Sequence, residues 1–122
     1  MAKVALTVDD SKTIREMVSF TLKNQGFDVM EAEDGKEALT VLGDKDVNVI
    51  ITDLNMPNMD GFELMKQLRA NPKYKFTPIL MLTTESDDAK KELGKQAGAT
   101  GWIVKPFNPE KLVQVVNKVT GG

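Results

Sequence analysis

Two chemically versatile residue types are missing from this sequence. Its 122 residues include no cysteine and no histidine. The lack of cysteine excludes disulfides, thiolate metal sites and cysteine nucleophiles. The lack of histidine removes the commonest general base, the commonest transition-metal ligand and any phosphohistidine intermediate on this chain. Several classes of enzyme and metal centre are therefore excluded before any motif is considered.

Long hydrophobic runs and a strong charge of one sign are also missing. The longest apolar stretch, near Ile79–Leu82, is far too short to span a bilayer, and the N-terminus lacks the apolar run of a secretory signal. Lys and Arg number 16 against 18 Asp and Glu, so the formal net charge is only −2. We therefore expect a protein of the reducing cytoplasm that neither inserts into membranes nor binds DNA.

The size and composition are those of one folded unit. Single cores commonly run to about 100–150 residues, and 41% hydrophobic residues is typical of a globular domain. We find no linker, repeat or low-complexity tract, and we expect one domain over residues 1–122. The start at Met1 favours a complete chain, although Gly121-Gly122 leaves open a boundary within a longer protein.

Short apolar runs alternate with longer amphipathic stretches along the chain. This pattern predicts strands over residues 3–8, 28–32, 47–52, 78–83 and 101–104. It predicts helices over residues 11–25, 35–42, 62–70, 87–96 and 109–119. Strands that are continuously hydrophobic are typical of a parallel sheet covered on both faces, and right-handed crossovers place helices on each. The sequence therefore predicts an α/β fold with five parallel strands and five helices in a three-layer sandwich.

The first predicted helix is bounded by residues typical of helix ends. Ser11 is its expected N-cap, and Gly26 stands where a helix needs a left-handed stop. At helical spacing its inward face would comprise Ile14, Met17, Val18, Thr21 and Leu22. In the last helix, Pro109 suits the first turn.

Polar residues follow four of the five predicted strands. The first strand ends in Asp9-Asp10, the third in Asp53, the fourth in Thr83-Thr84 and the fifth in Lys105. Ligands in parallel α/β folds gather at the carboxyl ends of the strands. If the first and third strands are neighbours, about 4.8 Å apart, their carboxylates crowd together and need a cation. A hard divalent ion such as Mg²⁺ suits such oxygen ligands best.

The same edge of the sheet collects groups that handle anions. Lys105 can pair with a carboxylate or hold a phosphoryl oxygen, and Thr83 adds a hydroxyl donor. Asp53, emerging centrally, is the candidate nucleophile for an aspartyl phosphate. Taken singly, each residue is more often a turn former, an N-cap or a solvated surface residue. Their joint order at the strand ends is what indicates phosphoryl transfer.

These motifs resemble the receiver domain of two-component response regulators, and the single-domain chemotaxis regulators most of all. The resemblance covers essentially the whole chain. Its motifs are Val8-Asp9-Asp10-Ser11, Ile51-Thr52-Asp53-Leu54-Asn55-Met56-Pro57 with Met59-Asp60-Gly61, Leu82-Thr83, and Val104-Lys105-Pro106-Phe107. The resemblance implies a flavodoxin-like, doubly wound sheet with strand order 2-1-3-4-5.

The resemblance also implies how a metal would be held. Asp53 is the implied phosphoacceptor. Asp10 would bind Mg²⁺ directly and Asp9 through water, and the backbone carbonyl of Asn55 would be a further ligand.

Four residues are implied to contact the phosphoryl group itself, and two more to tune its hydrolysis. Lys105 would contact one of its oxygens, and the Thr83 hydroxyl would donate to it. The backbone amides of Leu54 and Thr84 would help to cradle it. Asn55 and Glu85 stand at the two variable positions that tune hydrolysis in this family, and both are of the types found in fast-turnover chemotaxis regulators.

Thr83 and Trp102 stand at the positions of the family's conformational switch. Phosphorylation draws the strand-four hydroxyl inward, and an aromatic side chain of strand five moves into the vacated space. The family usually has tyrosine or phenylalanine where this chain has Trp102. An indole is larger, and overpacking costs about 1–3 kcal/mol. Two outcomes stay open: a full inward swing, or an indole that only packs between the last two helices.

The resemblance further implies the reaction and the partners. A histidine kinase would supply the phosphoryl group from its own phosphohistidine, since this chain has no histidine. The chain would catalyse only its own phosphorylation and dephosphorylation, so it is not expected to be a conventional enzyme. As a monomer it would signal by contact with an output protein such as the flagellar motor switch, and a phosphatase is an additional expected partner. The expected output face, helix four, strand five and helix five, carries Lys90, Lys91, Lys95, Lys111 and Lys118.

Three other functions compete with this interpretation. A flavin-binding electron carrier would need a phosphate loop rich in Ser, Thr and Gly after the first strand, where this chain has Asp9-Asp10-Ser11-Lys12. An aspartate-nucleophile phosphatase of the haloacid dehalogenase type places its two aspartates one residue apart, whereas Asp9 and Asp10 are adjacent. Within the receiver family, a stand-alone phosphorelay shuttle or a receiver cut from a larger regulator remains open.

Overall fold

Strands and helices alternate strictly along the chain in the computed structural model, which describes residues 2–121. The strands are β1 (Val4–Val8), β2 (Asp28–Ala32), β3 (Val49–Thr52), β4 (Ile79–Thr83) and β5 (Gly101–Val104). The helices are α1 (Lys12–Lys23), α2 (Gly35–Leu42), α3 (Gly61–Ala70), α4 (Asp88–Ala97) and α5 (Pro109–Thr120). Met1 and Gly122, on which the expectation about the chain ends partly depends, lie outside the described residues.

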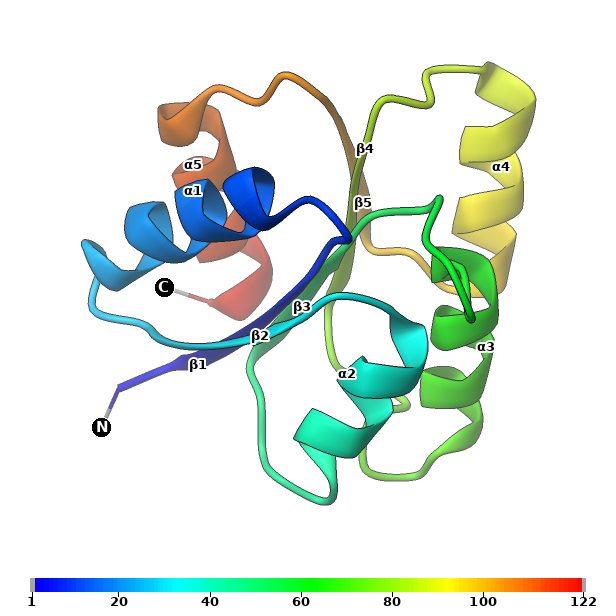
Figure 1. The fold of residues 1–122 in the computed structure, drawn as a ribbon, viewed down its shortest axis with the longest axis horizontal. Helices are drawn as coiled ribbons and strands as arrows, with labels where there is room; N and C mark the ends of the chain where they lie inside the picture. The colour runs from blue at the N-terminus through cyan, green and yellow to red at the C-terminus, as the bar shows by residue number, and fades with distance from the viewer. Residues whose placement is uncertain (1, 122) are drawn as a thin grey trace.

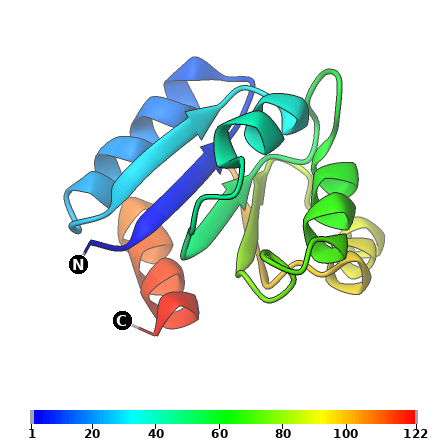
Figure 2. The same cartoon turned by 90° about the horizontal axis from the view of Figure 1, so that it is seen from below.

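The five strands form one parallel sheet in the order β2-β1-β3-β4-β5. Helices α1 and α5 cover one face, and α2, α3 and α4 cover the other (Figure 1). Figure 2 shows the sheet between these two helical layers. The predicted α/β sandwich, the flavodoxin-like topology and the strand order are thus confirmed.

The sheet separates the hydrophobic core into two halves. One half lies under α2, α3 and α4 and includes Leu6, Ile50 and Met81, while the other lies under α1 and α5 and includes Val18, Leu22 and Leu112. Every residue of β3 and β4 is buried. This explains why the strands are continuously hydrophobic rather than alternating.

The expected burial of Met17 and the expected start of β3 were wrong in detail. Met17 is 46% exposed, because the buried stripe of α1 runs through Ile14, Val18 and Leu22, and residue 17 lies about 100° around the helix from residue 18. Strand β3 begins at Val49 rather than at residue 47, because the Asn48 side chain accepts the Val4 amide at 2.8 Å beside the sheet.

Polar caps begin the helices. The side chains of Ser11, Asp34, Asp60, Asp87 and Asn108 each accept a backbone amide of the first turn. Since Asp60 is the cap of α3, that helix starts at Gly61, one residue earlier than expected. The cap at Ser11 and the proline in the first turn of α5 are confirmed. None of the helices within residues 2–121 combines the length and the apolar character needed to cross a membrane.

Candidate functional site

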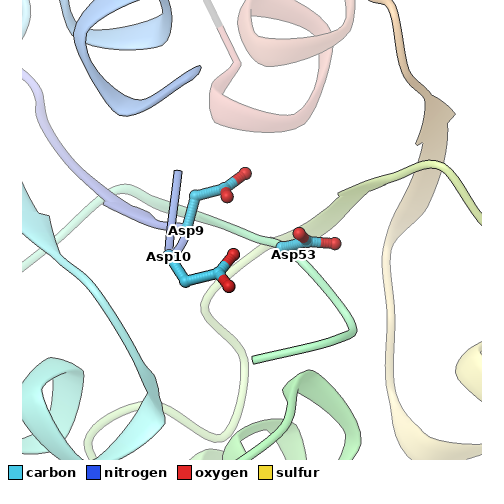
Figure 3. A group of neighbouring side chains, drawn as sticks. All are labelled: Asp9, Asp10 and Asp53. Atoms are coloured by element: carbon cyan, nitrogen blue, oxygen red, sulfur yellow. The ribbon is translucent and has the colours of Figure 1, made fainter. Parts of the chain in front are cut away.

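Three aspartates meet where β1 and β3 end. Asp9 and Asp10 follow β1, and Asp53 follows the neighbouring strand β3, in which Thr52 is paired with Val8. Figure 3 shows the three carboxylates at these adjoining ends. One ligand oxygen from each lies within 4.8 Å of the others. Asp9 and Asp53 are only 2% and 8% exposed, and Asp10 is exposed, so the cluster runs from the interior out to solvent.

Lys105 bridges the two buried carboxylates. Its Nζ atom donates to Asp9 Oδ2 at 2.7 Å and to Asp53 Oδ2 at 3.0 Å. The backbone places it there, because the Lys105 amide donates to the Thr83 carbonyl at 2.8 Å and continues the β4–β5 pairing. Among the ion pairs found in residues 2–121, none involves Asp10.

The charges of this cluster do not cancel. Burial raises the pKa of Asp9 above its usual 3.8 despite hydrogen bonds from Lys105 and the Ser11 amide. Burial alone would lower the pKa of Lys105, but hydrogen bonds to Asp9 and Asp53 outweigh it and raise the pKa above 10.5. Three carboxylates face one ammonium, so the site carries excess negative charge and offers only oxygen ligands. This donor set fits a hard divalent cation such as Mg²⁺.

Short local contacts hold the two buried carboxylates in place. The Ser11 amide donates to Asp9 Oδ1 at 2.9 Å, and the Leu54 amide donates to Asp53 Oδ1 at 2.7 Å. Helix α3 approaches closely, because a Cβ atom at Gly61 would lie 2.4 Å from the Asp53 carbonyl oxygen. Glycine at the first position of α3 therefore lets that helix begin directly beside Asp53.

The end of β4 is joined to Trp102 through one residue. Thr83 is fully buried, and its Oγ1 accepts the Glu85 amide at 3.3 Å. The carbonyl of Glu85 accepts the indole N–H of Trp102 at 2.8 Å. Thr84, which lies between Thr83 and Glu85 in the sequence, is exposed. The half-buried indole packs against the core half under α2, α3 and α4, and both outcomes given for its movement in a second state stay open.

The loop carrying Asn55 is tied to the start of α2. Asn58, which has a φ of 67°, donates from its side chain to Asp34 Oδ2 at 2.7 Å. The Gly35 amide donates to the Met59 carbonyl at 3.3 Å. Asn55 itself is exposed, two residues after Asp53, and the metal-binding role of its carbonyl stays a prediction.

Sequence reasoning missed Arg15. One of its terminal nitrogens donates to the Asp9 carbonyl at 2.6 Å, and its Nε lies 3.5 Å from Glu31 Oε1. A second cation thus lies against the backbone of the acidic cluster. The sequence signal for this contact was the position of Arg15 in the first turns of α1. Helical side chains lean toward the helix N-terminus, and Asp9 lies just before that end of α1.

Comparisons with known proteins agree with this geometry. A sequence profile described as response regulator receiver domain matches residues 5–117. A chemotaxis protein CheY homolog of Campylobacter jejuni is 47% identical over 118 residues, which cover 95% of this chain and 91% of that protein. The structure of chemotaxis response regulator CheY4 of Vibrio cholerae is similar with a TM-score of 0.92 and 53% identity, covering 98% of this chain and 99% of that one.

A more distant likeness is one of fold alone. The receiver domain of the sensor histidine kinase PA1611 of Pseudomonas aeruginosa, described with a magnesium ion coordinated in its active site cleft, has a TM-score of 0.91 at 24% identity and covers all of both chains.

Proposed function

The chain belongs to the response regulator receiver domain family, and we propose that it is the phosphoacceptor of a two-component chemotaxis pathway, with Asp53 receiving the phosphoryl group. The observation that carries this proposal is the placement of Asp53. Its carboxylate is buried beside Asp9, contacts the Lys105 ammonium at 3.0 Å and lies within 4.8 Å of ligand oxygens from two more carboxylates. The chemotaxis assignment is supported by the CheY-type relatives at about half identity.

The donor set supports Mg²⁺ as the cofactor. Asp9, Asp10, Asp53 and the backbone carbonyl of Asn55 would hold it. Bound there, the ion would supply positive charge to neutralise phosphoryl oxygens. Asp10 and Asp53 would be direct ligands, and Asp9 would act through water.

The acceptor step is a displacement at phosphorus. A carboxylate oxygen of Asp53 forms the new bond to phosphorus, and the bond from phosphorus to the histidine nitrogen of the kinase breaks, with the electron pair staying on that imidazole. Lys105 pairs with a phosphoryl oxygen, and the Thr83 hydroxyl donates to another. The backbone amides of Leu54 and Thr84 cradle the group.

The step that resets the protein is hydrolysis. Water forms a bond to phosphorus, the bond to the Asp53 oxygen breaks, and the products are inorganic phosphate and the free carboxylate. Asn55 and Glu85 flank this path and set its rate. The chain thus catalyses only the phosphorylation and dephosphorylation of its own Asp53.

The output face consists of α4, β5 and α5. It holds a hollow of about 310 Å³ lined in part by Lys91, Trp102, Phe107 and Lys111. Basic side chains around an apolar floor suit an acidic segment of an output protein such as the flagellar motor switch, and charge of this kind mainly raises encounter rates. Association that does not change with ionic strength would contradict this part of the proposal.

Acetyl phosphate provides the direct test. The protein is incubated with acetyl phosphate and Mg²⁺, and intact mass is measured for the wild type, Asp53→Asn and the control Asp28→Asn, whose carboxylate lies at the opposite end of the sheet. We expect one labile phosphoryl group on the wild type and on the control, and none on Asp53→Asn. An unmodified wild type, or a modified Asp53→Asn, would overturn the proposal.

The same samples identify the partners. A phosphorylated histidine kinase should transfer its label to the wild type and to Asp28→Asn. Proteins captured by the phosphorylated form, and not by Asp53→Asn, are the candidates for the output partner.

A further inference from the structure

Helix α4 contains a glycine in its interior. Gly94 lies seven residues into a ten-residue helix and is its only buried residue. Glycine is among the least favourable residues in a helix interior, because it has the most backbone freedom to lose. Gly94 is not among the glycines with a positive φ, so no left-handed conformation requires glycine there. The reason for a glycine at this position must therefore lie in what the helix packs against.

The space beside Gly94 is filled by Trp102. A Cβ atom on residue 94 would lie 2.6 Å from Cζ3 and 3.0 Å from Cε3 of the indole. The first distance is shorter than a carbon–carbon contact allows. The next atom, Cε1 of Phe62, would be at an ordinary 3.6 Å. The six-membered ring of Trp102 therefore occupies the volume that any other side chain on residue 94 would need.

The opposite edge of the same indole is held by a hydrogen bond. Its Nε1 donates to the Glu85 carbonyl at 2.8 Å, and the Glu85 amide donates to Thr83 Oγ1 at 3.3 Å. The side chain thus reaches from the middle of α4 to the β4–α4 loop. A phenylalanine at residue 102 could not make this hydrogen bond, because it lacks the indole N–H.

We infer that Gly94 is a positioning residue for Trp102: the missing side chain lets the indole lie against α4, where its N–H holds the Glu85 carbonyl and so orders the loop over residues 84–87 next to Thr83. This assigns a role to a residue outside the acidic cluster and explains how the fold accommodates an indole at residue 102. The inference holds whether or not Asp53 accepts a phosphoryl group.

A double-mutant cycle tests whether Gly94 and Trp102 depend on each other. In the wild type, Gly94→Ala should lower the melting temperature, because the new methyl group collides with the indole. In the Trp102→Leu background, the same substitution should raise the melting temperature, because the ring is gone and alanine is the better helix former. A rise of similar size in both backgrounds would overturn the inference. If Gly94→Ala does not fold, the double variant must fold, and its failure would overturn the inference as well.

Two spectroscopic measurements separate positioning from general destabilisation. Trp102 is the only tryptophan, so Gly94→Ala should shift its emission to longer wavelength as the indole moves outward. Amide hydrogen exchange over residues 84–87 should become faster in the same variant. Leu93→Ala is the matched control, because Leu93 is 51% exposed on the same helix, and it should change neither signal.

Emission and exchange that stay at wild-type values in Gly94→Ala would refute the positioning role. None of these measurements uses a phosphoryl donor. Failure of this inference is therefore distinct from failure of the proposed function.

Discussion

Replacing Asp10 with asparagine should raise the free energy of unfolding when no divalent metal is present. Asp10 is the exposed member of the acidic cluster. Lys105 contacts the other two carboxylates, at 2.7 Å for Asp9 and 3.0 Å for Asp53. The positive charge of Arg15 is matched by Glu31, 3.5 Å away, so two negative charges less the one positive charge of Lys105 leave a single negative charge facing Asp10. Asparagine keeps the size of the side chain and removes this repulsion.

The size of the effect follows from the geometry. The ligand oxygens of the cluster lie within 4.8 Å of one another, and two like charges at that distance repel by about 0.9 kcal/mol in water. Because Asp10 is exposed, the value for water applies. We expect a gain of about 1 kcal/mol, which for a chain of this length corresponds to a rise of roughly 3–5 °C in melting temperature.

Thermal unfolding followed by circular dichroism measures this gain. In a chelating buffer, Asp10→Asn should melt above the wild type, and the difference should shrink in high salt. Mg²⁺ at ten times its dissociation constant should stabilise the wild type by about 1.4 kcal/mol and the variant hardly at all. Asp28→Asn, which removes an exposed charge at the far end of β2, should match the wild type in both buffers.

Two results would refute this reasoning. One is an Asp10→Asn variant that melts below the wild type without metal, because the cluster would then not be repulsive. The other is a variant that gains as much stability from Mg²⁺ as the wild type does, because Asp10 would then not bind the ion.

Further predictions concern other parts of the site. Gly61→Ala should cost about 1–3 kcal/mol, because its Cβ would lie 2.4 Å from the Asp53 carbonyl oxygen; an unchanged midpoint in urea would contradict this close approach. Burial by itself would lower the pKa of Lys105, but the hydrogen bonds to Asp9 and Asp53 outweigh burial and hold the pKa above 10.5 in the folded state. The stabilisation it contributes is therefore complete below pH 10.5 and is lost as the pH rises through the folded-state pKa. The loss of stability between pH 9 and 12 should be shallower in Lys105→Gln, and an equally steep loss would argue against the ion pair. Beryllofluoride with Mg²⁺ should change the emission of Trp102, and constant emission despite independently confirmed binding would count against a moving indole.

Much of the fold could be predicted because its signals are local. Continuously hydrophobic strands, amphipathic helices and polar caps depend on residues near one another in the sequence. They led to the alternation of elements, the parallel sheet and the edge at which Asp9, Asp53 and Lys105 meet. The strand order came from the family resemblance. Met17 was misplaced because spacing alone does not say how wide the buried stripe of a helix is.

The detailed contacts of the site could not be predicted in the same way. Three contacts depend on partners from different elements of the fold. Lys105 pairs with Asp9 and Asp53. Arg15 donates to the Asp9 carbonyl, and the ring of Trp102 packs against Gly94. Hydrophobic patterning determines which face of each element turns inward. Which atoms then touch is decided by strand register and by how closely each helix approaches the sheet, and these distances exist only once the whole chain has packed.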